Sequence, residues 1–298
     1  MNVSVVMATR NREALLRETI ADALAQEPLP AEIVVVDGTP EHEPETDAYL
    51  AEVAGRIRHL RHSRPELIAA RALGLEAATG EVILFIDDDV ALPPGFVAAH
   101  AVPSAGRTVG AVAGRVVVQR EVRRPLAAPP PPTGQGCDRV DRRDVAFGRG
   151  CNVSFRRAAL LAAGGFDQRL TGNPAADEED ACFAVRRLGS RSVVDPAAWL
   201  IHRYAPTGGI RAAVRDQGDD LSSCRNTGYF ASNNVGGLDF WRVLWNTCRT
   251  STLSDRARRG GLGTLARRQA LFWRGAVEGV RQFRRSGQRR VPLPSRRP

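Results

Sequence analysis

The chain has 298 residues and a formal net charge of +9, and all 42 of its basic residues are arginine. A hydrophobic content of 43% is enough for the core of one large domain, which excludes a disordered chain. No apolar stretch approaches the ~20 residues needed to cross a bilayer, so we expect no membrane span. Neither zinc-finger spacing nor an aromatic-rich RNA-binding signature accompanies the positive charge, so we expect no nucleic-acid partner.

The cellular compartment is predicted from the cysteines and the N-terminus. The 5 cysteines form no CxxC pair and leave an odd count, which is typical of reduced thiols. The N-terminus lacks the pattern of a signal peptide. We therefore expect a cytoplasmic protein, either free or peripheral at the inner face of the membrane.

Strands and helices are predicted to alternate in the first part of the chain. Residues 3–8 and 33–36 are runs of Val, Ile and other apolar residues that predict buried strands, and a shorter strand is expected near 57–60. Apolar residues recur at helical spacing over 15–24, and a second helix is expected over 66–78. This alternation predicts a parallel, right-handed α/β sheet.

The most informative segment is 82–90, an apolar strand that ends in the consecutive carboxylates of Asp87, Asp88 and Asp89. A run of Val, Ile, Leu and Phe predicts a strand buried on both faces, and open α/β sheets bind ligands at the carboxyl ends of such strands. Neighbouring carboxylates repel one another, and a divalent cation with oxygen ligands would relieve that repulsion. The segment predicts a metal and a phosphate-bearing ligand; the alternative is an acidic, solvated turn.

Other polar side chains are expected at the same edge of the sheet. Asp37 follows the second strand and can accept a hydrogen bond from a ribose hydroxyl or a base N–H. Arg10, which follows Thr9 at the end of the first strand, and Arg71 in the second helix can pair with phosphate or with the carboxylates. Together these groups suit a nucleoside diphosphate, although each one alone is better explained as a turn or surface residue.

A proline-rich segment over 119–144 separates two parts of the chain, 1–118 and 145–206. It predicts either a lid that flanks a sugar pocket or an exposed surface loop. The small residues that follow it permit a close backbone approach, and we expect Gly150 and Asn152 to line the sugar or acceptor pocket.

The C-terminal part is predicted to change from strands to helices. Short strands are expected over 193–196 and 199–201, and the second leads directly into His202. Further helices are expected over 238–252 and 262–285. The last of these has apolar residues near one side and many arginines between them, so it either packs on the catalytic domain or lies on an anionic membrane surface.

Several separated motifs occur in one order along the chain. They are Thr9-Arg10-Asn11-Arg12, Val35-Val36-Asp37, Ala69-Ala70-Arg71, Gly80-Glu81, Phe85-Ile86-Asp87-Asp88-Asp89, Gly150-Cys151-Asn152-Val153-Ser154-Phe155-Arg156-Arg157, Gly164-Gly165-Phe166-Asp167, Glu178-Glu179-Asp180, Arg186 and Gly189. Together they resemble the family 2 glycosyltransferases, which are inverting, metal-dependent enzymes. The resemblance implies the GT-A fold, with a Rossmann-like, mostly parallel sheet flanked by helices, over 1–206. A helical, arginine-rich extension would follow over 207–298.

The resemblance also implies roles for individual residues. Those assigned to the nucleotide sugar are Thr9, Arg10, Arg12, Asp37, Arg71, Asp87 and Asp88. Asp89, the last acid of the DXD motif, and His202 would bind a divalent metal on the diphosphate, either Mn²⁺ or Mg²⁺, and a neutral imidazole suits manganese better. Asp180 would be the base that deprotonates an acceptor hydroxyl, with Glu179 beside it in the acceptor pocket. Cys182 departs from the pattern, because the family often has another acid there.

The predicted activity is transfer of a single hexose-like sugar from a nucleotide diphosphate sugar to a hydroxyl acceptor. The acceptor would be a saccharide, a lipid-linked glycan or a natural product. A processive synthase is disfavoured because membrane spans and a QxxRW motif are absent. A sugar-1-phosphate nucleotidyltransferase is a second hypothesis, although no glycine-rich loop follows the first strand. The third is a non-catalytic, arginine-rich protein that binds membrane or RNA.

Overall fold

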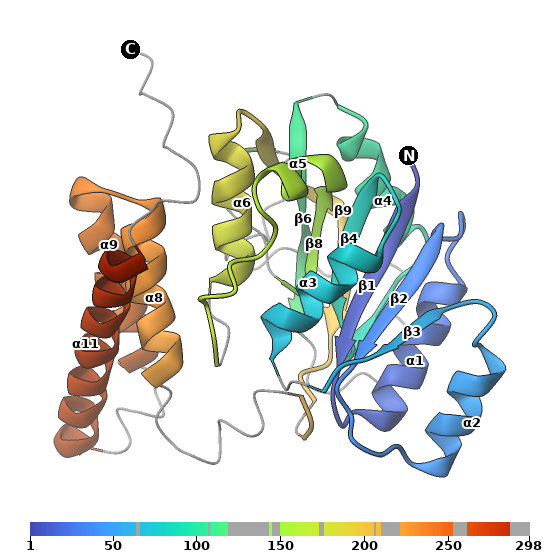
Figure 1. Cartoon of the computed structure of the whole chain (residues 1–298), viewed down its shortest axis with the longest axis horizontal. Helices are drawn as coiled ribbons and strands as arrows, with labels where there is room; N and C mark the ends of the chain where they lie inside the picture. The colour runs from blue at the N-terminus through green and yellow to red at the C-terminus, as the bar shows by residue number, and fades with distance from the viewer. Residues whose placement is uncertain are drawn as a thin grey trace.

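A computed structural model describes residues 1–63, 66–106, 108–118, 143–144, 150–172, 176–205, 207–209, 221–252 and 261–286. Its N-terminal part alternates strand and helix (Figure 1). The elements are β1 (Val3–Thr9), α1 (Glu13–Leu24), β2 (Glu32–Asp37), α2 (Pro44–Glu52), β3 (Arg58–Arg61), α3 (Leu67–Ala77) and β4 (Val82–Asp87). The strands and helices predicted for this part are therefore confirmed.

The second part of the domain completes a mixed sheet. Its elements are β5 (Val90–Ala91), α4 (Phe96–Ser104), β6 (Val109–Val118), β7 (Arg143–Asp144), β8 (Asn152–Arg156), α5 (Arg157–Ala162), α6 (Asp177–Arg187) and β9 (Arg191–His202). The strand order is β3-β2-β1-β4-β8-β6-β9-β5, and β7 also pairs with β9. The strands from β3 to β4 are parallel, whereas β8 runs antiparallel to both of its neighbours, β4 and β6. Since β6 pairs in parallel with β9, the strands β1 to β4, β6 and β9 all run in one direction, as predicted for a mostly parallel sheet, and β5, β7 and β8 run against them.

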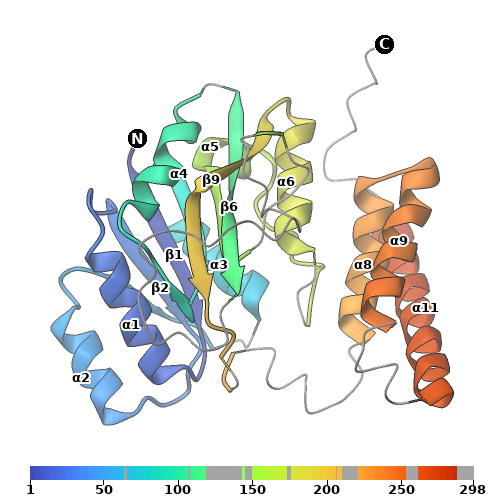
Figure 2. The same ribbon diagram turned by 180° about the vertical axis from the view of Figure 1, so that it is seen from behind.

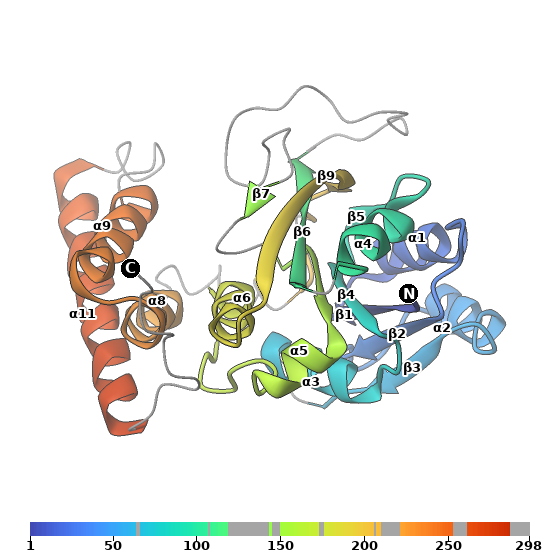
Figure 3. The ribbon, with the colours of Figure 1, turned by 90° about the horizontal axis from the view of Figure 1, so that it is seen from above.

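Alternate residues of β4 enter two different apolar layers. Ile83 and Phe85 pack in the layer that contains residues of α3, α5 and α6, whereas Leu84 and Ile86 pack with residues of α1 and α4. Figure 2 shows α1 and α4 in front of the sheet, and Figure 3 shows helices on both sides of it. Because both faces are covered, β4 reads as a continuous apolar run rather than as an alternating one.

Two features of the sheet differ from the sequence prediction or were absent from it. The segments 193–196 and 199–201 belong to one strand, β9. The register of β9 against β6 shifts between Gly114 and Arg115, and the residues that separate the two segments fall within this shift. That correction arises because Pro196 marks an irregularity within the strand rather than its end. The strands β6 and β8 were not predicted. The proline-rich segment 119–144 lies outside the described residues, apart from β7.

Among the described residues, three helices follow the sheet: α8 (Leu221–Asn234), α9 (Gly237–Thr252) and α11 (Gly261–Ser286). The predicted helices over 238–252 and 262–285 are therefore confirmed, whereas α8 was not predicted as a helix. α8 lies nearest to α6, with α9 and α11 on its far side (Figures 1 and 3). Among the described residues no helix is both long and apolar enough to cross a bilayer.

Small residues allow α8 and α11 to approach closely. A Cβ atom added at Gly279 would overlap the backbone of Arg225 and Tyr229, and one added at Gly228 would overlap the backbone of Ala276. Phe272 and Ala276 are also buried at this contact. The apolar side of α11 therefore packs mainly on α8 and α9, whereas the two alternatives expected for this helix were the catalytic domain and an anionic membrane surface.

Replacement of Gly279 by alanine should destabilise the protein by about 1–3 kcal/mol, because the methyl group has no room at the helix crossing. Gly263 lies in the same helix with nothing within 4 Å of an added Cβ, so Gly263→Ala should raise stability by up to about 1 kcal/mol through helix propensity. Urea unfolding of the two variants measures both effects. Equal effects of the two substitutions would contradict the close packing.

Candidate active site

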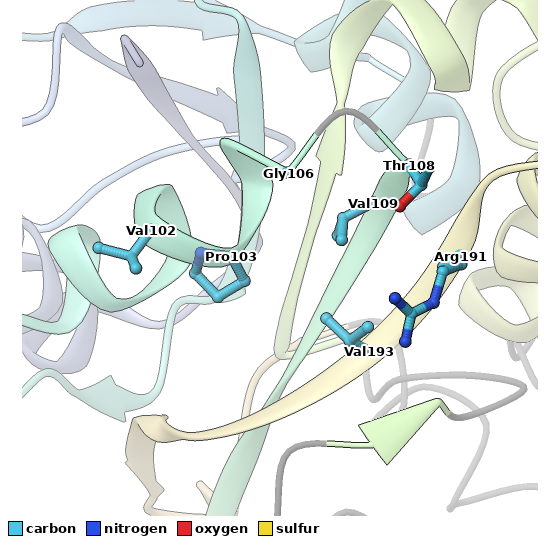
Figure 4. Close-up of a pocket in the computed structure, with 7 residues that line it drawn as sticks. All are labelled: Val102, Pro103, Gly106, Thr108, Val109, Arg191 and Val193. Carbon is cyan, nitrogen blue, oxygen red and sulfur yellow. The ribbon is translucent and has the colours of Figure 1, made fainter.

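The sheet brings the predicted nucleotide-binding residues to one edge. In the register of the parallel strands Thr9 lies opposite Asp37, and Ala8 lies opposite Asp87. The carboxyl ends of β1, β2 and β4 therefore meet side by side, as expected for a ligand site in an open α/β sheet. A pocket of about 360 Å³, lined by Val102, Pro103, Gly106, Thr108, Val109, Arg191 and Val193, lies elsewhere, at the starts of β6 and β9 (Figure 4). It contains no carboxylate.

Two arginines compensate the acids that follow β4. Arg12 contacts the carboxylates of both Asp88 and Asp89 at 2.8 Å. Arg71, which is buried in α3, pairs with Asp177 and lies 3.8 Å from Asp87. Pairing with these acids raises the pKa of each guanidinium despite burial, so both arginines remain cationic.

Asp88 is held inside the protein. Its carboxylate accepts hydrogen bonds from the Thr9 hydroxyl at 2.7 Å and from Arg12 at 2.8 Å. Burial raises the pKa of Asp88 to about 7, although both partners oppose the shift. A cation bound beside these acids would favour the ionised form and lower that pKa.

A candidate metal centre lies around Asp87, Asp89 and His202. The Nε2 atom of His202 is 3.3 Å from Asp87 Oδ2 and 3.6 Å from Asp89 Oδ1. Asp89 is fully buried, and its Oδ1 has no hydrogen-bond partner in the described structure, while its Oδ2 accepts from the Ala205 N–H. A buried carboxylate oxygen without a partner is costly, and carboxylates with an imidazole form a donor set that suits a divalent cation. The residues therefore fit a metal.

The ring of His202 imposes one condition on that site. Its Nδ1 accepts a hydrogen bond from the Tyr204 N–H at 3.1 Å, so a neutral ring carries its proton on Nε2. A ring that binds a cation through Nε2 must instead carry the proton on Nδ1. Metal binding therefore requires the contact with Tyr204 to open.

Asp37 is enclosed by cationic and polar partners. Its Oδ2 contacts His42 Nε2 at 2.6 Å, His59 Nε2 at 2.9 Å and an Arg61 nitrogen at 3.0 Å. The hydrogen bonds with His59 and His42 help to hold the pKa of Asp37 well below its usual range despite burial. His42 also contacts Glu13 through Nδ1 at 2.9 Å, which raises its own pKa. Nothing in the sequence pattern identified this pair of histidines.

Gly150 and Asn152 occupy different environments. The Gly150 N–H donates to Glu178 at 2.9 Å, and a Cβ at this position would overlap the Arg71 guanidinium. Gly150 therefore lies at the acidic cluster because it has no side chain. Asn152 is fully buried and donates to the carbonyls of Arg115 and Ala198, so it joins strands rather than lining an open pocket. The predicted residue Arg10 has one described contact, from the Gly209 N–H to its carbonyl.

The acids at the start of α6 point to two different places. Asp177 and Glu178 lie beside Arg71 and Gly150, while half-buried Glu179 follows in the same turn. Asp180 is fully buried, and its Oδ1 accepts from the side-chain amides of Asn233 and Asn234 at 2.9 and 2.7 Å. The sequence run of four acids gave no signal that separates these two sets.

Comparison with known proteins identifies the family. The profile of glycosyl transferase family 2 matches residues 4–162, which is more than half of the chain. The chain belongs to this family. A relative from Haloferax volcanii, named glucosyl-dolichyl phosphate glucuronosyltransferase, is 29% identical over 219 residues, which cover 68% of this chain and 69% of that protein. The pre-mycofactocin glycosyltransferase of Mycobacterium tuberculosis is 26% identical over 68% of this chain, which spans only 43% of that relative.

Solved structures show that this family 2 glycosyltransferase has the GT-A fold. The mannosyltransferase PcManGT from Pyrobaculum calidifontis, in complex with GDP-Man and Mn²⁺, aligns with a TM-score of 0.54 and 19% identity over 94% of this chain and 87% of that one. GalNAc-T7 with UDP, GalNAc and Mn²⁺ gives a TM-score of 0.63 and 18% identity over 99% of this chain and 58% of that one. TarS of S. aureus gives a TM-score of 0.59 and 14% identity over 97% of this chain and 92% of that one.

Two buried histidines of this glycosyltransferase should titrate in opposite directions. His42 bridges Asp37 and Glu13, so its pKa should exceed the ordinary value of about 6.5. Burial instead lowers the pKa of His100 to about 4. The stability that His42 contributes is therefore present below pH 6.5 and lost as the pH rises through its folded-state pKa, whereas that of His100 is lost as the pH falls towards 4.

Ring NMR signals followed across pH measure both pKa values. Glu13→Gln should lower the pKa of His42 and leave that of His100 unchanged. A His42 pKa at or below 6.5 in the unmodified protein would contradict the bridged arrangement.

Proposed function

We propose that the protein transfers a single sugar, with inversion, from a nucleoside diphosphate sugar to a hydroxyl acceptor, using a divalent metal at the end of β4. The observation that supports this most strongly is the convergence of Asp87, Asp89 and His202, with a buried oxygen of Asp89 that has no hydrogen-bond partner among the described residues. Two solved neighbours are complexes that contain Mn²⁺ with a sugar nucleotide or UDP, which supports the same ligand class and favours manganese.

The donor would lie across the edge formed by β1, β2 and β4. Asp37 is placed to accept from a ribose hydroxyl or a base N–H once one of its present partners moves, and exposed Arg61 is the partner that can move most easily. Arg12 and Arg71 supply positive charge beside the acids, where phosphate oxygens would approach. When bound, the metal would neutralise charge that develops on the leaving diphosphate.

Glu178 is a better placed base than Asp180, the residue predicted from the sequence. A general base must reach an acceptor hydroxyl, and the Glu178 side chain is 22% exposed beside Arg71, whereas Asp180 is fully buried against α8. Burial and the neighbouring charge of Asp177 raise the pKa of Glu178 well above 4.5, which makes its carboxylate a stronger base. Asp180 would instead hold α6 against α8.

In the proposed reaction Glu178 takes the proton of the acceptor hydroxyl. The acceptor oxygen forms a bond to the anomeric carbon while the bond from that carbon to the diphosphate oxygen breaks, so the nucleoside diphosphate leaves with the electron pair. Of the three acceptor classes, a lipid-linked saccharide is supported by the name of the Haloferax relative, which refers to glucosyl-dolichyl phosphate.

Substitution of the two candidate acids separates their roles. Glu178→Gln should lower kcat by roughly 10²–10⁴-fold while leaving binding of the nucleotide sugar intact, because only proton transfer is lost. Asp180→Asn should retain most of kcat, since an amide oxygen can still accept from Asn233 and Asn234. Single-turnover assays with a panel of UDP-, GDP- and dTDP-sugars measure both effects. If Asp180→Asn lowered the rate more than Glu178→Gln did, Asp180 would be the base.

Loss of the metal site provides the second test. Asp89→Ala should abolish the metal-dependent binding of the nucleoside diphosphate, measured by calorimetry with Mn²⁺, with Mg²⁺ and with a chelator. If the unmodified protein bound no sugar nucleotide under any of these conditions, the proposed donor site would be wrong.

A further inference from the structure

Cys151 lies beside the acids because of the register between β4 and β8. The antiparallel ladder pairs Ile86 with Asn152, so the next step along both chains places Cys151 opposite Asp87. Residues directly opposite each other in an antiparallel pair are close neighbours. The register therefore brings Cys151 next to Asp87, the first acid of the DXD motif.

The thiol belongs to the same cluster as the histidine. The Cys151 Sγ, a carboxylate oxygen of Asp87 and a ring nitrogen of His202 all lie within 4.8 Å of one another. Cys151 and His202 are both buried. Nε2 of the same histidine also lies 3.6 Å from Asp89 Oδ1, the buried oxygen that no hydrogen bond satisfies in the described structure. This oxygen independently points to a cation at the cluster.

We propose that Cys151 is a ligand of the metal, so that the site offers sulfur and nitrogen in addition to carboxylate oxygen. This inference rests on the metal site of the proposed function. On binding, the thiol loses its proton to solvent and the thiolate forms a bond to the cation, with no change of oxidation state. A thiolate disfavours the hard Mg²⁺ ion and favours Mn²⁺, Co²⁺, Zn²⁺ and Cd²⁺, increasingly as the metal becomes softer.

Cobalt gives a direct test, because a bond between thiolate and Co²⁺ produces a charge-transfer absorption band in the near ultraviolet. The full chain titrated with Co²⁺ should develop this band, and Cys151→Ser should bind Co²⁺ without it. Cys182→Ser is the matched control. Cys182, like Cys151, is buried in an apolar layer, but among the described residues it belongs to no group of side chains that could hold a metal, so this variant should keep the band. Circular dichroism and Cys151→Ala exclude misfolding as the cause of a loss.

The outcomes distinguish the role of Cys151 from the existence of the metal site on which that role rests. Co²⁺ that binds without the band, or a band that survives in Cys151→Ser, would overturn the role of Cys151 and leave the metal site intact. An unmodified protein that binds no Co²⁺ would overturn both. Competition with Mg²⁺ adds a second measurement: Cys151→Ser should reduce the preference for Cd²⁺ over Mg²⁺ at least about tenfold, which equals 1.4 kcal/mol.

A different observation carries a second inference, on helix α9. Its large apolar side chains Leu238, Trp241 and Trp245 are 75%, 59% and 61% exposed. At 100° per residue they fall within one narrow sector of the helix, whereas Leu244 and Cys248 occupy the buried side. These three exposed residues are called the α9 face.

We propose that the α9 face docks on an anionic membrane surface. Arg242 and Arg249 lie next to the face on its solvent side, and both are exposed; Arg242 also pairs with Asp239 at 3.0 Å. The chain as a whole carries a net charge of +9, which complements anionic lipid headgroups. Indole rings at the boundary between apolar and charged residues are typical of helices that lie in the membrane interface. Because α11 uses its own apolar side for packing, α9 rather than α11 presents this surface.

Vesicle binding tests the second inference. The full chain should sediment with vesicles of phosphatidylglycerol and phosphatidylcholine but not with phosphatidylcholine alone, and added salt should weaken the binding. The double variant Trp241→Ala with Trp245→Ala should lose at least about tenfold in partitioning, whereas Leu29→Ala, which removes a side chain that is 60% exposed elsewhere, should not.

The alternative occupants of the face give different results. Dimer formation through the α9 face would overturn the membrane assignment. The same conclusion would follow if the protein did not bind vesicles and the double variant changed only its self-association in light scattering. Equal binding to neutral and anionic vesicles would overturn the part assigned to the arginines.

Discussion

The structure of the site depends on how negative charge is compensated at the carboxyl end of β4. Asp87, Asp88 and Asp89 are crowded there with the acids that open α6, in a region that water reaches poorly. Carboxylates in such a place either protonate, pair with cations or bind a metal. Arg12 pairs with Asp88 and Asp89, and Arg71 pairs with Asp177, yet burial still raises the pKa of Asp88 to about 7. This crowding of carboxylates is the reason that we propose a cation site at this edge of the sheet.

The helices beyond the sheet are tied to the same centre through α8. Asn233 and Asn234 bind the Asp180 carboxylate, and the hydroxyl of buried Tyr229 donates to Asp167 at 2.9 Å. Arg187, near the end of α6, also donates to the Asn234 side chain. Because α6 starts with Asp177 and Glu178, α8 fixes the direction from which these acids meet Arg71. A change in α8 should therefore be felt at the acidic cluster without touching a ligand.

The sequence was informative where a residue's role follows from its position on one strand. The apolar run before Asp87 predicted a strand buried on both faces. The alternation of strands and helices up to β4 was also predicted correctly, because the spacing of apolar residues differs between strands and helices. The strands β6 and β8 were not predicted. The antiparallel strand β8 inserts between β4 and β6, and no local sequence pattern indicates this pairing. The contact of His59 with Asp37 and the approach of Cys151 to Asp87 depend on register across strands, and the contact of His42 depends on the path of the loop after β2; one sequence displays neither.

The three acids of the motif are alike in sequence but not in their bonding. Asp87 continues the alternation of Ile83 and Phe85 and so turns towards α3, where Arg71 lies. Asp88 turns the other way and is bound by Thr9 and Arg12. Asp89 divides its two oxygens: one is held by Arg12 and a backbone N–H, and the other faces His202 without a hydrogen bond. A carboxylate held at one oxygen cannot turn away, so its second oxygen is fixed in place, and a cation that bound there would cost little side-chain entropy. The turn after β4 therefore gives three identical side chains different surroundings: Asp87 neighbours the α3 arginine, Asp88 is bound by Thr9 and Arg12, and Asp89 faces His202 at the proposed metal site.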